Sequence, residues 1–402
     1  MSNAFAMHES LRDEFHLPRG ISAYLCGNSL GLQPKATRAA LIAELDAWAE
    51  YAVEGHFRGD KPWMDYHSFA RDGLSHILGA KPTEVVAMNG LTVNLHLLMA
   101  SFYRPQGKRR KILIEAGAFP SDRHAVASQI GFHGFDPNAD LIELKPAGEA
   151  FTLDEILQAI DQAGLELALV LWPGVQYRTG QAFDLAAITQ AAHAVGALVG
   201  FDLAHAVGNL ALELHDSNAD FAVWCSYKYL NAGAGAVAGA FVHERHAKFS
   251  GPRLAGWWGH DASTRFKMGP EFIPTPGADG WQLSNPPVLA LAPLLVSLEQ
   301  FQRFGIARVR ERSGALTELA IGQLQAHFDA QIEILTPLDA AERGAQLSLR
   351  VRAGRDAGRA RFEHMHARGV LGDWREPDVI RVAFPGLYAE TSDVHELLEA
   401  LR

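Results

Sequence analysis

The feature that most constrains the fold is a set of short, continuous apolar runs separated by stretches of helical periodicity. The runs lie at residues 84–88, 111–114, 168–172, 197–201 and 221–224. Between them, the segments 93–102, 121–129 and 185–194 carry apolar residues at helical spacing. Helices are also predicted before the first run, at residues 35–53 and 66–78. Strands that are apolar on both faces and alternate with helices are typical of a mostly parallel sheet covered on both sides. The sequence therefore predicts an α/β fold.

The chain changes character after two consecutive prolines, Pro286 and Pro287. A long helical pattern covers residues 288–303, more helix follows, and short strands and helices finish the chain. A length of 402 residues allows two domains with a large buried core. The expected parts are an N-terminal segment that packs with the small domain (1–54), a large cofactor-binding domain (55–285) and a small α+β C-terminal domain (286–402).

Composition argues against several classes of protein. The net charge of −10 comes without a basic face, which disfavours a nucleic-acid binder. The two cysteines, Cys26 and Cys225, have neither disulfide-framework nor zinc-site spacing, and residues 243–246 (HERH) are one residue short of the HExxH zinc motif. No apolar window of ~20 residues and no signal-peptide pattern occurs. We therefore expect a cytoplasmic protein with no metal site and no nucleic-acid or membrane partner.

Two charged residues follow neighbouring apolar runs. Asp202 comes directly after the run 197–201, and Lys228 follows the run 221–224. Ligands of parallel sheets bind beyond the carboxyl ends of the strands. Enzymes that use pyridoxal 5'-phosphate (PLP) hold it with a lysine, which forms a Schiff base, and an aspartate, which keeps the pyridine nitrogen protonated. The pair therefore predicts a PLP site.

Other polar and aromatic residues near these strand ends could complete the site. Thr92 lies in the turn before a helix, where free backbone N–H groups attract a phosphate. Tyr227 could add its hydroxyl group to the phosphate site. Phe119 is placed to stack on the pyridine ring, and His205 could lie beside that ring or brace Asp202.

Each of these residues also has a purely structural interpretation. A lone lysine usually packs its stem on the surface. Asp202 and Thr92 could be helix caps, while His205 and Phe119 could be ordinary core side chains. The spacing of Asp202 and Lys228 favours the functional interpretation for that pair.

A series of sequence motifs occurs in order along most of the chain. They are residues 25–34 (LCGNSLGLQP), 55–63, 119–122 (FPSD), 177–181 (YRTGQ), 200–208, 224–235, 256–260 (GWWGH), 284–287 (SNPP) and 380–382 (IRV). This series resembles the kynureninase family, PLP enzymes of fold type I in the aspartate-aminotransferase-like superfamily.

The resemblance implies a fold, an activity and an assembly. The implied fold is the PLP-dependent transferase fold type I, with a mostly parallel central sheet and a smaller α+β C-terminal domain. The implied enzyme is a hydrolase of tryptophan catabolism and NAD biosynthesis that cleaves the Cβ–Cγ bond of L-kynurenine to give anthranilate and L-alanine. The resemblance leaves open whether 3-hydroxykynurenine is also a substrate. It further implies a homodimer with its active site at the subunit interface.

The resemblance also assigns roles to individual residues. Catalysis is implied for Lys228, as Schiff-base lysine and proton shuttle, and for Asp202 and Tyr227. Cofactor binding is implied for Leu91, Thr92, Phe119, Pro120, Ser121, Asp122, Asp202, His205, Tyr227 and Lys228, and for Trp257 and Asn285 of the neighbouring subunit. Arg381 would clamp the substrate α-carboxylate, a task suited to its bidentate fork. The surroundings of the substrate's aromatic amine and ketone would be Ser29, His56 and Asn285.

Two positions depart from the family pattern. Pro173 stands where some relatives carry a hydroxyl residue that contacts the cofactor. Proline has no N–H and no side-chain donor, so that contact is lost or not needed in this chain. Arg178 stands where some relatives carry an aromatic residue.

Two other functions remain open from the sequence. One is another fold type I enzyme, such as an aminotransferase or a cysteine desulfurase. A desulfurase needs a mobile-loop cysteine in the C-terminal third, and no cysteine follows Cys225. The other is a non-catalytic PLP-fold binding protein. The joint presence of Lys228, Asp202 and Arg381 disfavours it, because a binder has no need of a Schiff-base lysine.

Overall fold

The centre of the molecule is a seven-stranded sheet. The computed structural model describes residues 9–402, so the first eight residues of the expected N-terminal segment lie outside it. In spatial order the strands are β4 (Val85–Ala87), β10 (Gly239–Val242), β9 (Phe221–Trp224), β8 (Leu198–Asp202), β7 (Leu167–Pro173), β5 (Lys111–Glu115) and β6 (Leu141–Leu144). Strand β10 pairs antiparallel with β4 and β9, and the other pairs are parallel. The prediction of a mostly parallel sheet is confirmed.

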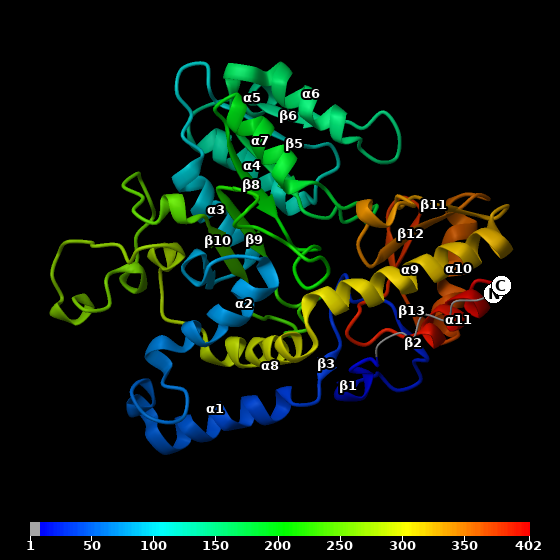
Figure 1. Ribbon diagram of the computed structural model, residues 1–402, viewed down its shortest axis with the longest axis horizontal. Helices are drawn as coiled ribbons and strands as arrows, with labels where there is room; N and C mark the ends of the chain where they lie inside the picture. Colours follow the sequence, from blue (N-terminus) through cyan, green and yellow to red (C-terminus); the bar gives the residue numbers. More distant parts are fainter. Residues whose placement is uncertain (1–8) are drawn as a thin grey trace.

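Side chains of this sheet alternate between two apolar cores. Leu113, Val170 and Val199 point into one core, and the preceding residues Ile112 and Leu169 point into the other. The first core is covered by α2 (Arg71–Leu78), α6 (Leu153–Ala163), α7 (Leu185–Ala194) and α8 (Val288–Phe304), and the second by α3 (Leu91–Phe102) and α4 (Pro120–Phe132) (Figure 1). Burial on both faces is the reason why these strands are continuous apolar runs in the sequence.

Most predicted elements occur with boundaries shifted by a few residues. The stretch 66–78, predicted as one helix, is instead a 3-10 segment, Trp63–Ala70, followed by α2. Helix α6 was not predicted from the sequence, although Thr152 and Glu155 form a capping box at its start. The short strands β6 and β10 were not predicted either.

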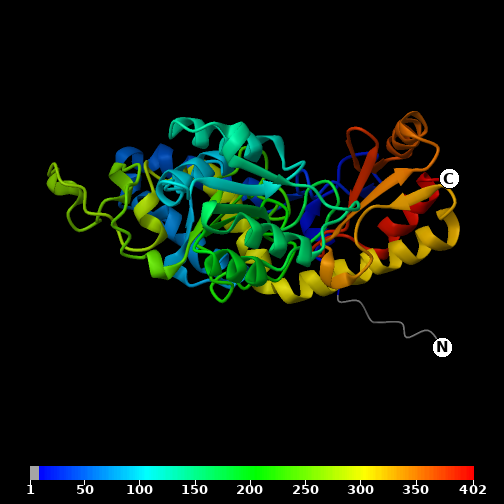
Figure 2. The ribbon, with the colours of Figure 1, turned by 90° about the horizontal axis from the view of Figure 1, so that it is seen from above.

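The C-terminal part of the chain forms a second sheet with its own apolar core. Its antiparallel strands are, in spatial order, β11 (Ile332–Ile334), β12 (Gln346–Val351), β15 (Val379–Ala383) and β14 (Asp373–Arg375). The helices that share this core are α9 (Ile306–Phe328), α10 (Arg355–Ala367) and α11 (Thr391–Ala400). Figures 1 and 2 show α8 and α9, in yellow, connecting this part to the seven-stranded sheet.

The N-terminal segment contacts both units. Strand β2 (Ala23–Tyr24) pairs in parallel with β13 (Val370–Leu371), and α1 (Thr37–Tyr51) packs along α8. The remaining short elements are β1 (Phe15–His16), β3 (Gln33–Pro34) and α5 (Pro137–Asp140). Within residues 9–402, no helix combines the length and apolar character needed to cross a bilayer. The domain boundaries near residues 54 and 285 stay a prediction.

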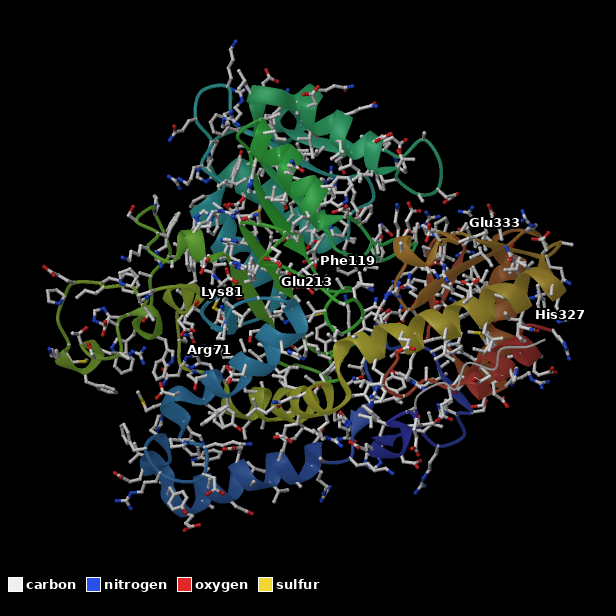
Figure 3. The ribbon with its side chains drawn as sticks, in the orientation of Figure 1. Arg71, Lys81, Phe119, Glu213, His327 and Glu333 are labelled. Carbon is white, nitrogen blue, oxygen red and sulfur yellow. The ribbon has the colours of Figure 1, made fainter. Side chains whose placement is uncertain are left out.

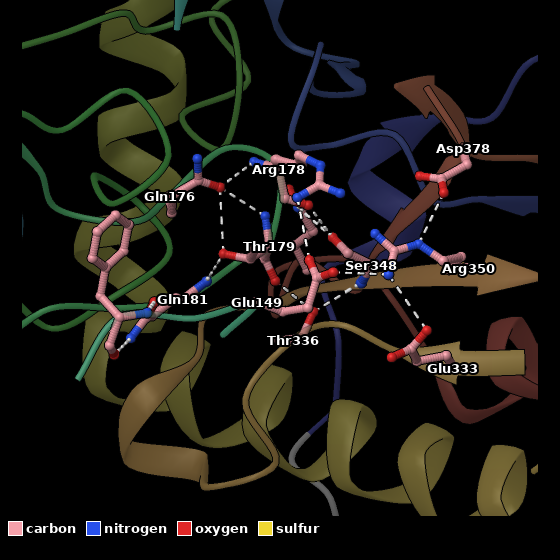
Figure 4. A network of polar contacts seen from close by, with 12 residues as sticks. Glu149, Gln176, Arg178, Thr179, Gln181, Glu333, Thr336, Ser348, Arg350 and Asp378 are labelled. Carbon is pink, nitrogen blue, oxygen red and sulfur yellow. Dashed lines mark hydrogen bonds and ion pairs between the residues drawn. The ribbon is translucent and has the colours of Figure 1, made fainter. Parts of the chain in front are cut away.

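A polar network fastens the loop after β7 to the C-terminal sheet (Figure 4). Thr336 Oγ1 donates to the Thr179 carbonyl at 2.6 Å and accepts from the Ser348 N–H at 2.8 Å. Ser348 Oγ donates to the Arg178 carbonyl. Nearby, Arg350 forms ion pairs with three carboxylates, those of Glu149, Glu333 and Asp378. These contacts fix the position of the C-terminal sheet relative to the strand ends of the central sheet.

Candidate active site

A cavity of about 240 Å³ is lined by residues from the carboxyl ends of β5, β7 and β8 and from the C-terminal sheet. The predicted site residues that line it are Ser29, Leu91, Thr92, Phe119, Ser121, Asp122, Asp202, His205, Tyr227, Lys228 and Arg381. Figure 3 places Phe119 at the junction of the two units. The predicted site residues that are not among its lining residues are His56, Pro120, Trp257 and Asn285.

The loop that carries Lys228 is braced by the N-terminal segment. The Gly31 N–H donates to the Tyr227 carbonyl at 2.8 Å. A Cβ atom on Gly31 would lie 2.4 Å from the Lys228 carbonyl oxygen, so this close approach requires glycine. Lys228 Nζ lies 5.9 Å from the centre of the Phe119 ring, and it forms no ion pair with a carboxylate of residues 9–402. The lysine loop is therefore held rigidly while its amine stays available.

Three carboxyl groups, those of Glu115, Asp122 and Asp202, interact at one end of the cavity. Asp202 Oδ1 accepts from the Ala204 N–H at 2.8 Å, so the expected capping contact occurs, although a turn rather than a helix follows. Burial raises the pKa of Asp122 well above its usual range, and the charge of Asp202 and a hydrogen bond with it raise that pKa further. Burial also raises the pKa of Glu115, to about 8. The charge of Asp202 raises this pKa as well, whereas a hydrogen bond from Gln176 lowers it. Glu115 therefore favours its protonated form at neutral pH, and Asp122 holds its proton more strongly than an ordinary aspartic acid does.

Several buried polar atoms of this region have no hydrogen-bond partner among the described residues. They include Glu115 Oε2, Asp122 Oδ1 and His205 Nδ1. Burial, followed by the charges of Lys228 and Arg381, lowers the pKa of His205 well below its usual value. The imidazole is therefore neutral at pH 7. Because buried polar groups are normally hydrogen-bonded, these atoms mark places where a bound molecule would supply the partner.

A second polar corner lies between the N-termini of α3 and α4. Thr92 Oγ1 and Ser121 Oγ are 2.6 Å apart. The first N–H groups of a helix have no acceptor within that helix, and the helix dipole favours an anion beside them. Two helix N-termini with two hydroxyl groups fit a phosphate group.

The C-terminal sheet contributes a basic corner. The fully buried Arg381 donates to both carboxylate oxygens of Asp373, and its Nη1 donates to the Tyr177 carbonyl at 2.5 Å. Its Nη2 also lies 3.2 Å from Ser29 Oγ, and that hydroxyl donates to Asp373. Burial opposes ionisation of Asp373, but the hydrogen bond and charge of Arg381 lower its pKa below the usual range. A second guanidinium, that of Arg375, lines the cavity beside Arg381.

Three residues of the cavity region, Glu115, Asp373 and Arg375, were not predicted from the sequence. Glu115 ends β5 just as Asp202 ends β8, so the rule that found Asp202 would also have found it. Asp373 and Arg375 are two residues apart on β14 and so lie on the same face of the sheet, and Asp373 lies directly opposite Arg381 on β15. That relation appears only when the two strands are paired.

The two departures from the family pattern lie in different surroundings. Pro173, the last residue of β7, lines the cavity. The Arg178 side chain instead lies 3.4 Å from Glu149 and is not among the lining residues. Of the two departures, only Pro173 therefore lies at the cavity.

The other predicted residues lie outside the cavity of their own chain. His56 Nδ1 is 3.0 Å from the Val53 carbonyl oxygen, and its ring packs edge-on against Trp63. Trp257 and Asn285 are exposed, on the long excursion between β10 and α8. Figure 2 shows this excursion, in yellow-green, extending from the end of the molecule opposite the C-terminal unit.

The residues around the cavity fit PLP in chemistry and arrangement. The Lys228 amine suits the cofactor's aldehyde, the Asp202 carboxylate suits its pyridine nitrogen, and the corner of Thr92 and Ser121 suits its phosphate. Asp122 Oδ1 and His205 Nδ1, which have no hydrogen-bond partner among the described residues, also fit PLP, since each would gain a polar neighbour from it.

Solved structures share the fold of this chain. A cysteine desulfurase from Thermococcus onnurineus NA1 is similar with a TM-score of 0.77 and 15% identity, covering 97% of this chain and 96% of that chain. A C-DES variant with glycine covalently linked to its PLP cofactor has a TM-score of 0.79 and 18% identity, covering 94% and 96%. At such identities the likeness concerns the fold alone, and the prediction of fold type I is confirmed.

Sequence comparison identifies the family. Residues 309–401 match the family described as the kynureninase C-terminal domain. A kynureninase of Xanthomonas euvesicatoria pv. vesicatoria (strain 85-10) is 60% identical over 395 residues, covering 97% of this chain and 93% of the relative. A kynureninase of Stenotrophomonas maltophilia (strain K279a) is 57% identical with the same coverage. The chain therefore belongs to the kynureninase family, the PLP-dependent hydrolases of a carbon–carbon bond that the sequence motifs predicted.

Proposed function

We propose that this chain hydrolyses the Cβ–Cγ bond of L-kynurenine to give anthranilate and L-alanine. The observation that carries the proposal is the cavity with Lys228 and Asp202 just after adjacent strands, in a chain that is 60% identical to a kynureninase. Bound PLP supplies an electron-withdrawing ring that stabilises negative charge at the substrate Cα. The other contributions come from the side chains of this chain.

The proposed cofactor contacts follow the chemistry of the cavity. Lys228 holds PLP covalently, and Asp202 keeps the pyridine nitrogen protonated. Asp122 supports Asp202, because the raised pKa of Asp122 favours a carboxyl proton that can be donated to its neighbour. His205 and Phe119 contact the ring as a neutral imidazole and an aromatic face. The proposed phosphate contacts are Leu91, Thr92, Pro120, Ser121 and Tyr227.

The proposed proton transfers involve Lys228 and Tyr227. Once the substrate's amine has taken the place of Lys228 on the cofactor, the freed Lys228 Nζ removes the proton from the substrate Cα. Water adds to the γ-carbonyl carbon, the Cβ–Cγ bond breaks, and Cβ takes up a proton. Burial, aided by a hydrogen bond with Cys225, raises the pKa of Tyr227. Its hydroxyl therefore keeps its proton at neutral pH and can donate it to Cβ.

The proposed substrate site combines the basic corner of one subunit with residues from the second subunit of a dimer. Arg381 binds the α-carboxylate, with Ser29 beside it, and His56 and Asn285 surround the aromatic amine and ketone. Trp257 and Asn285 would come from a second copy of the chain. The exposure of both residues, outside their own cavity, supports this arrangement.

Exposed apolar side chains support the homodimer. Trp48, Val53 and Phe57 are 61, 70 and 62% exposed, and all three lie in or just after α1. Phe266 and Met268 are exposed on the excursion that carries Trp257. Apolar groups gathered in this way are typical of an interface between proteins. Sedimentation should give a dimer, and a monomer at working concentration would contradict the proposal.

Mixing two inactive variants tests the shared site. Co-expressed Lys228→Ala and Asn285→Ala chains would form mixed dimers with one site that carries both changes and one that carries neither. If Asn285 serves the partner's site, the mixture should recover about a quarter of wild-type activity. No recovery above the separate variants would contradict the shared site.

The activity is tested with purified, PLP-loaded protein and L-kynurenine. Anthranilate fluorescence and L-alanine should appear in equal amounts, and 3-hydroxykynurenine is the second substrate to compare. An aminotransferase would instead convert PLP to its amine form with simple amino acids, and a non-catalytic binder would form no product. We place the activity in the cytoplasm, in tryptophan catabolism and the supply of NAD precursors.

A further inference from the structure

The basic corner contains a guanidinium, that of Arg375, whose N–H donors have few hydrogen-bond acceptors among the described residues. Arg375 lines the cavity, and its Nε is buried without a hydrogen-bond partner among the described residues. Its Nη2 makes two long contacts, 3.4 Å to Ser29 Oγ and 3.5 Å to Asp373 Oδ2. A buried donor without an acceptor is costly, so this group is well placed to gain one from a ligand.

Arg381 differs from Arg375 in this respect. Its guanidinium is fully buried and donates to both oxygens of Asp373, to the Tyr177 carbonyl and to Ser29 Oγ. A substrate carboxylate that bound Arg381 alone would have to share that group with Asp373. The binding capacity of Arg381 is therefore largely used before any substrate arrives.

Strand pairing places the three charged groups on one face of the C-terminal sheet. Asp373 and Arg375 are two residues apart on β14, so their side chains point to the same face. Arg381 lies directly opposite Asp373 on β15. The three groups together carry one net positive charge, which a single carboxylate would neutralise.

We propose that Arg375 binds the substrate's α-carboxylate together with Arg381, and that Asp373 fixes Arg381 in position for this contact. The inference rests on the proposed function, since it concerns the same substrate. Two guanidinium groups that share one carboxylate supply more charge-assisted hydrogen bonds than one fork alone. Arg375 is then a specificity residue for α-amino acids that carry a free carboxylate.

Steady-state kinetics of two variants test the contact. Arg375→Gln removes the charge and should raise KM for L-kynurenine about 10- to 100-fold while kcat changes less than about 3-fold. Arg375→Lys keeps the charge but loses the planar fork, so its KM should be intermediate. Arg355→Gln is a matched control, because Arg355 is an exposed arginine that pairs with Glu376. Its kinetics should match the wild type.

Two ligands separate carboxylate recognition from a structural role. L-Alanine, the product that carries the α-carboxylate, should inhibit Arg375→Gln more weakly by the same factor as the rise in KM. Kynuramine, the decarboxylated analogue of kynurenine, should bind wild type and variant equally. An unchanged KM, or an equal weakening of both ligands, would overturn the proposal.

A binding titration makes the result independent of turnover. The absorbance change of bound PLP on adding L-alanine should give a dissociation constant about 10-fold or more higher in Arg375→Gln, with PLP content and melting temperature unchanged. If that variant fails to fold, Arg375→Lys is measured in the same way, and an unaltered constant overturns the proposal. If wild-type protein binds L-alanine through Arg375 but leaves kynurenine intact, the proposed function fails and the assignment of Arg375 stands.

Discussion

Buried acids at the two opposite edges of the mostly parallel sheet differ in how many hydrogen-bond and ion-pair partners they have. Asp220 comes just before β9, at the amino edge. One of its oxygens contacts Arg245 at 2.7 Å and His246 at 2.8 Å. The other contacts His193 at 2.9 Å and accepts from the Val199 N–H at 2.8 Å. Each oxygen of this carboxylate therefore has two hydrogen-bond or ion-pair partners.

The acids at the carboxyl edge are in the reverse situation. Glu115 and Asp122 each keep a buried oxygen without a partner among the described residues. Burial raises the pKa of both groups, whereas at Asp220 the contacts with His193, His246 and Arg245 outweigh burial and lower the pKa. A buried acid whose oxygens all have hydrogen-bond or ion-pair partners therefore stabilises the fold, while a buried acid with an unpaired oxygen indicates a ligand site.

The largest expected effect is that of removing the lysine at the carboxyl edge. Lys228→Ala should abolish the visible absorbance of lysine-bound PLP and reduce turnover at least ~10³-fold, because no other amine replaces Nζ. Lys248→Ala, at an exposed lysine, is the control. Activity near the wild-type level in Lys228→Ala would contradict the site.

The comparison predicts a kinetic effect at Asp202. Asp202→Asn keeps the shape of the side chain but loses the charge that holds the pyridine proton. We expect kcat/KM to fall about 10²- to 10³-fold, with a free energy of unfolding close to that of the wild type. Unchanged kinetics with full PLP content would contradict the assigned role.

At Asp220 the expectation is the opposite. Asp220→Asn leaves Arg245 without its buried counter-charge and should lower the free energy of unfolding by about 3 kcal/mol. Activity per folded, PLP-loaded site should stay at the wild-type level. Urea unfolding measures the first quantity and active-site titration the second. If Asp220→Asn is stable but inactive, the purely structural role of Asp220 is contradicted.

Per pH unit, the smallest expected effect is a change in the free energy of unfolding that has opposite sign at the two edges. Glu115 has a folded pKa of about 8 and an ordinary value of 4.5, so folded protein binds a proton that unfolded chain lacks between these values. Its stabilising contribution is full below pH 4.5 and is lost as pH rises towards 8, at up to about 1.4 kcal/mol per pH unit. Asp220 has a lowered pKa, so its contribution is present above its ordinary value of 3.8 and is lost at lower pH.

Cofactor-free protein, unfolded in urea at several pH values, reveals both signs. Between pH 5 and 8, wild type should lose more stability than Glu115→Gln, whose amide mimics the protonated acid. Between pH 5 and 3, the stability difference between wild type and Asp220→Asn should shrink. Parallel stability curves for the wild type and Glu115→Gln would show that Glu115 is ionised in the folded protein.

The sequence was most informative where chemistry follows directly from position along a strand. Asp202 ends an apolar run, and the pairing of β7 with β8 brings Pro173 opposite it at the same edge of the sheet. Thr92 and Ser121 were predicted separately, and the fold brings their hydroxyl groups to hydrogen-bonding distance. These residues could be found because strand ends and helix starts have local signals.

Contacts between distant segments carry no such local signal. Asp373 and Arg375 acquire meaning only through the register of β14 with β15. Gly31 is required by a close approach to the loop of Lys228, which lies almost two hundred residues away in the chain. In α1, Glu44 is buried against Tyr66 and Trp63 while Trp48 is exposed, which the helical periodicity alone did not predict.

Chemical trapping shows whether the cavity at the carboxyl edge of the sheet holds PLP on Lys228. PLP-loaded protein is reduced with borohydride, which makes the lysine–cofactor bond permanent, then digested and sequenced by mass spectrometry. We predict the label on the peptide that contains Lys228, at close to one per chain. A label on another lysine, or unlabelled Lys228 in protein that still forms anthranilate, would contradict it.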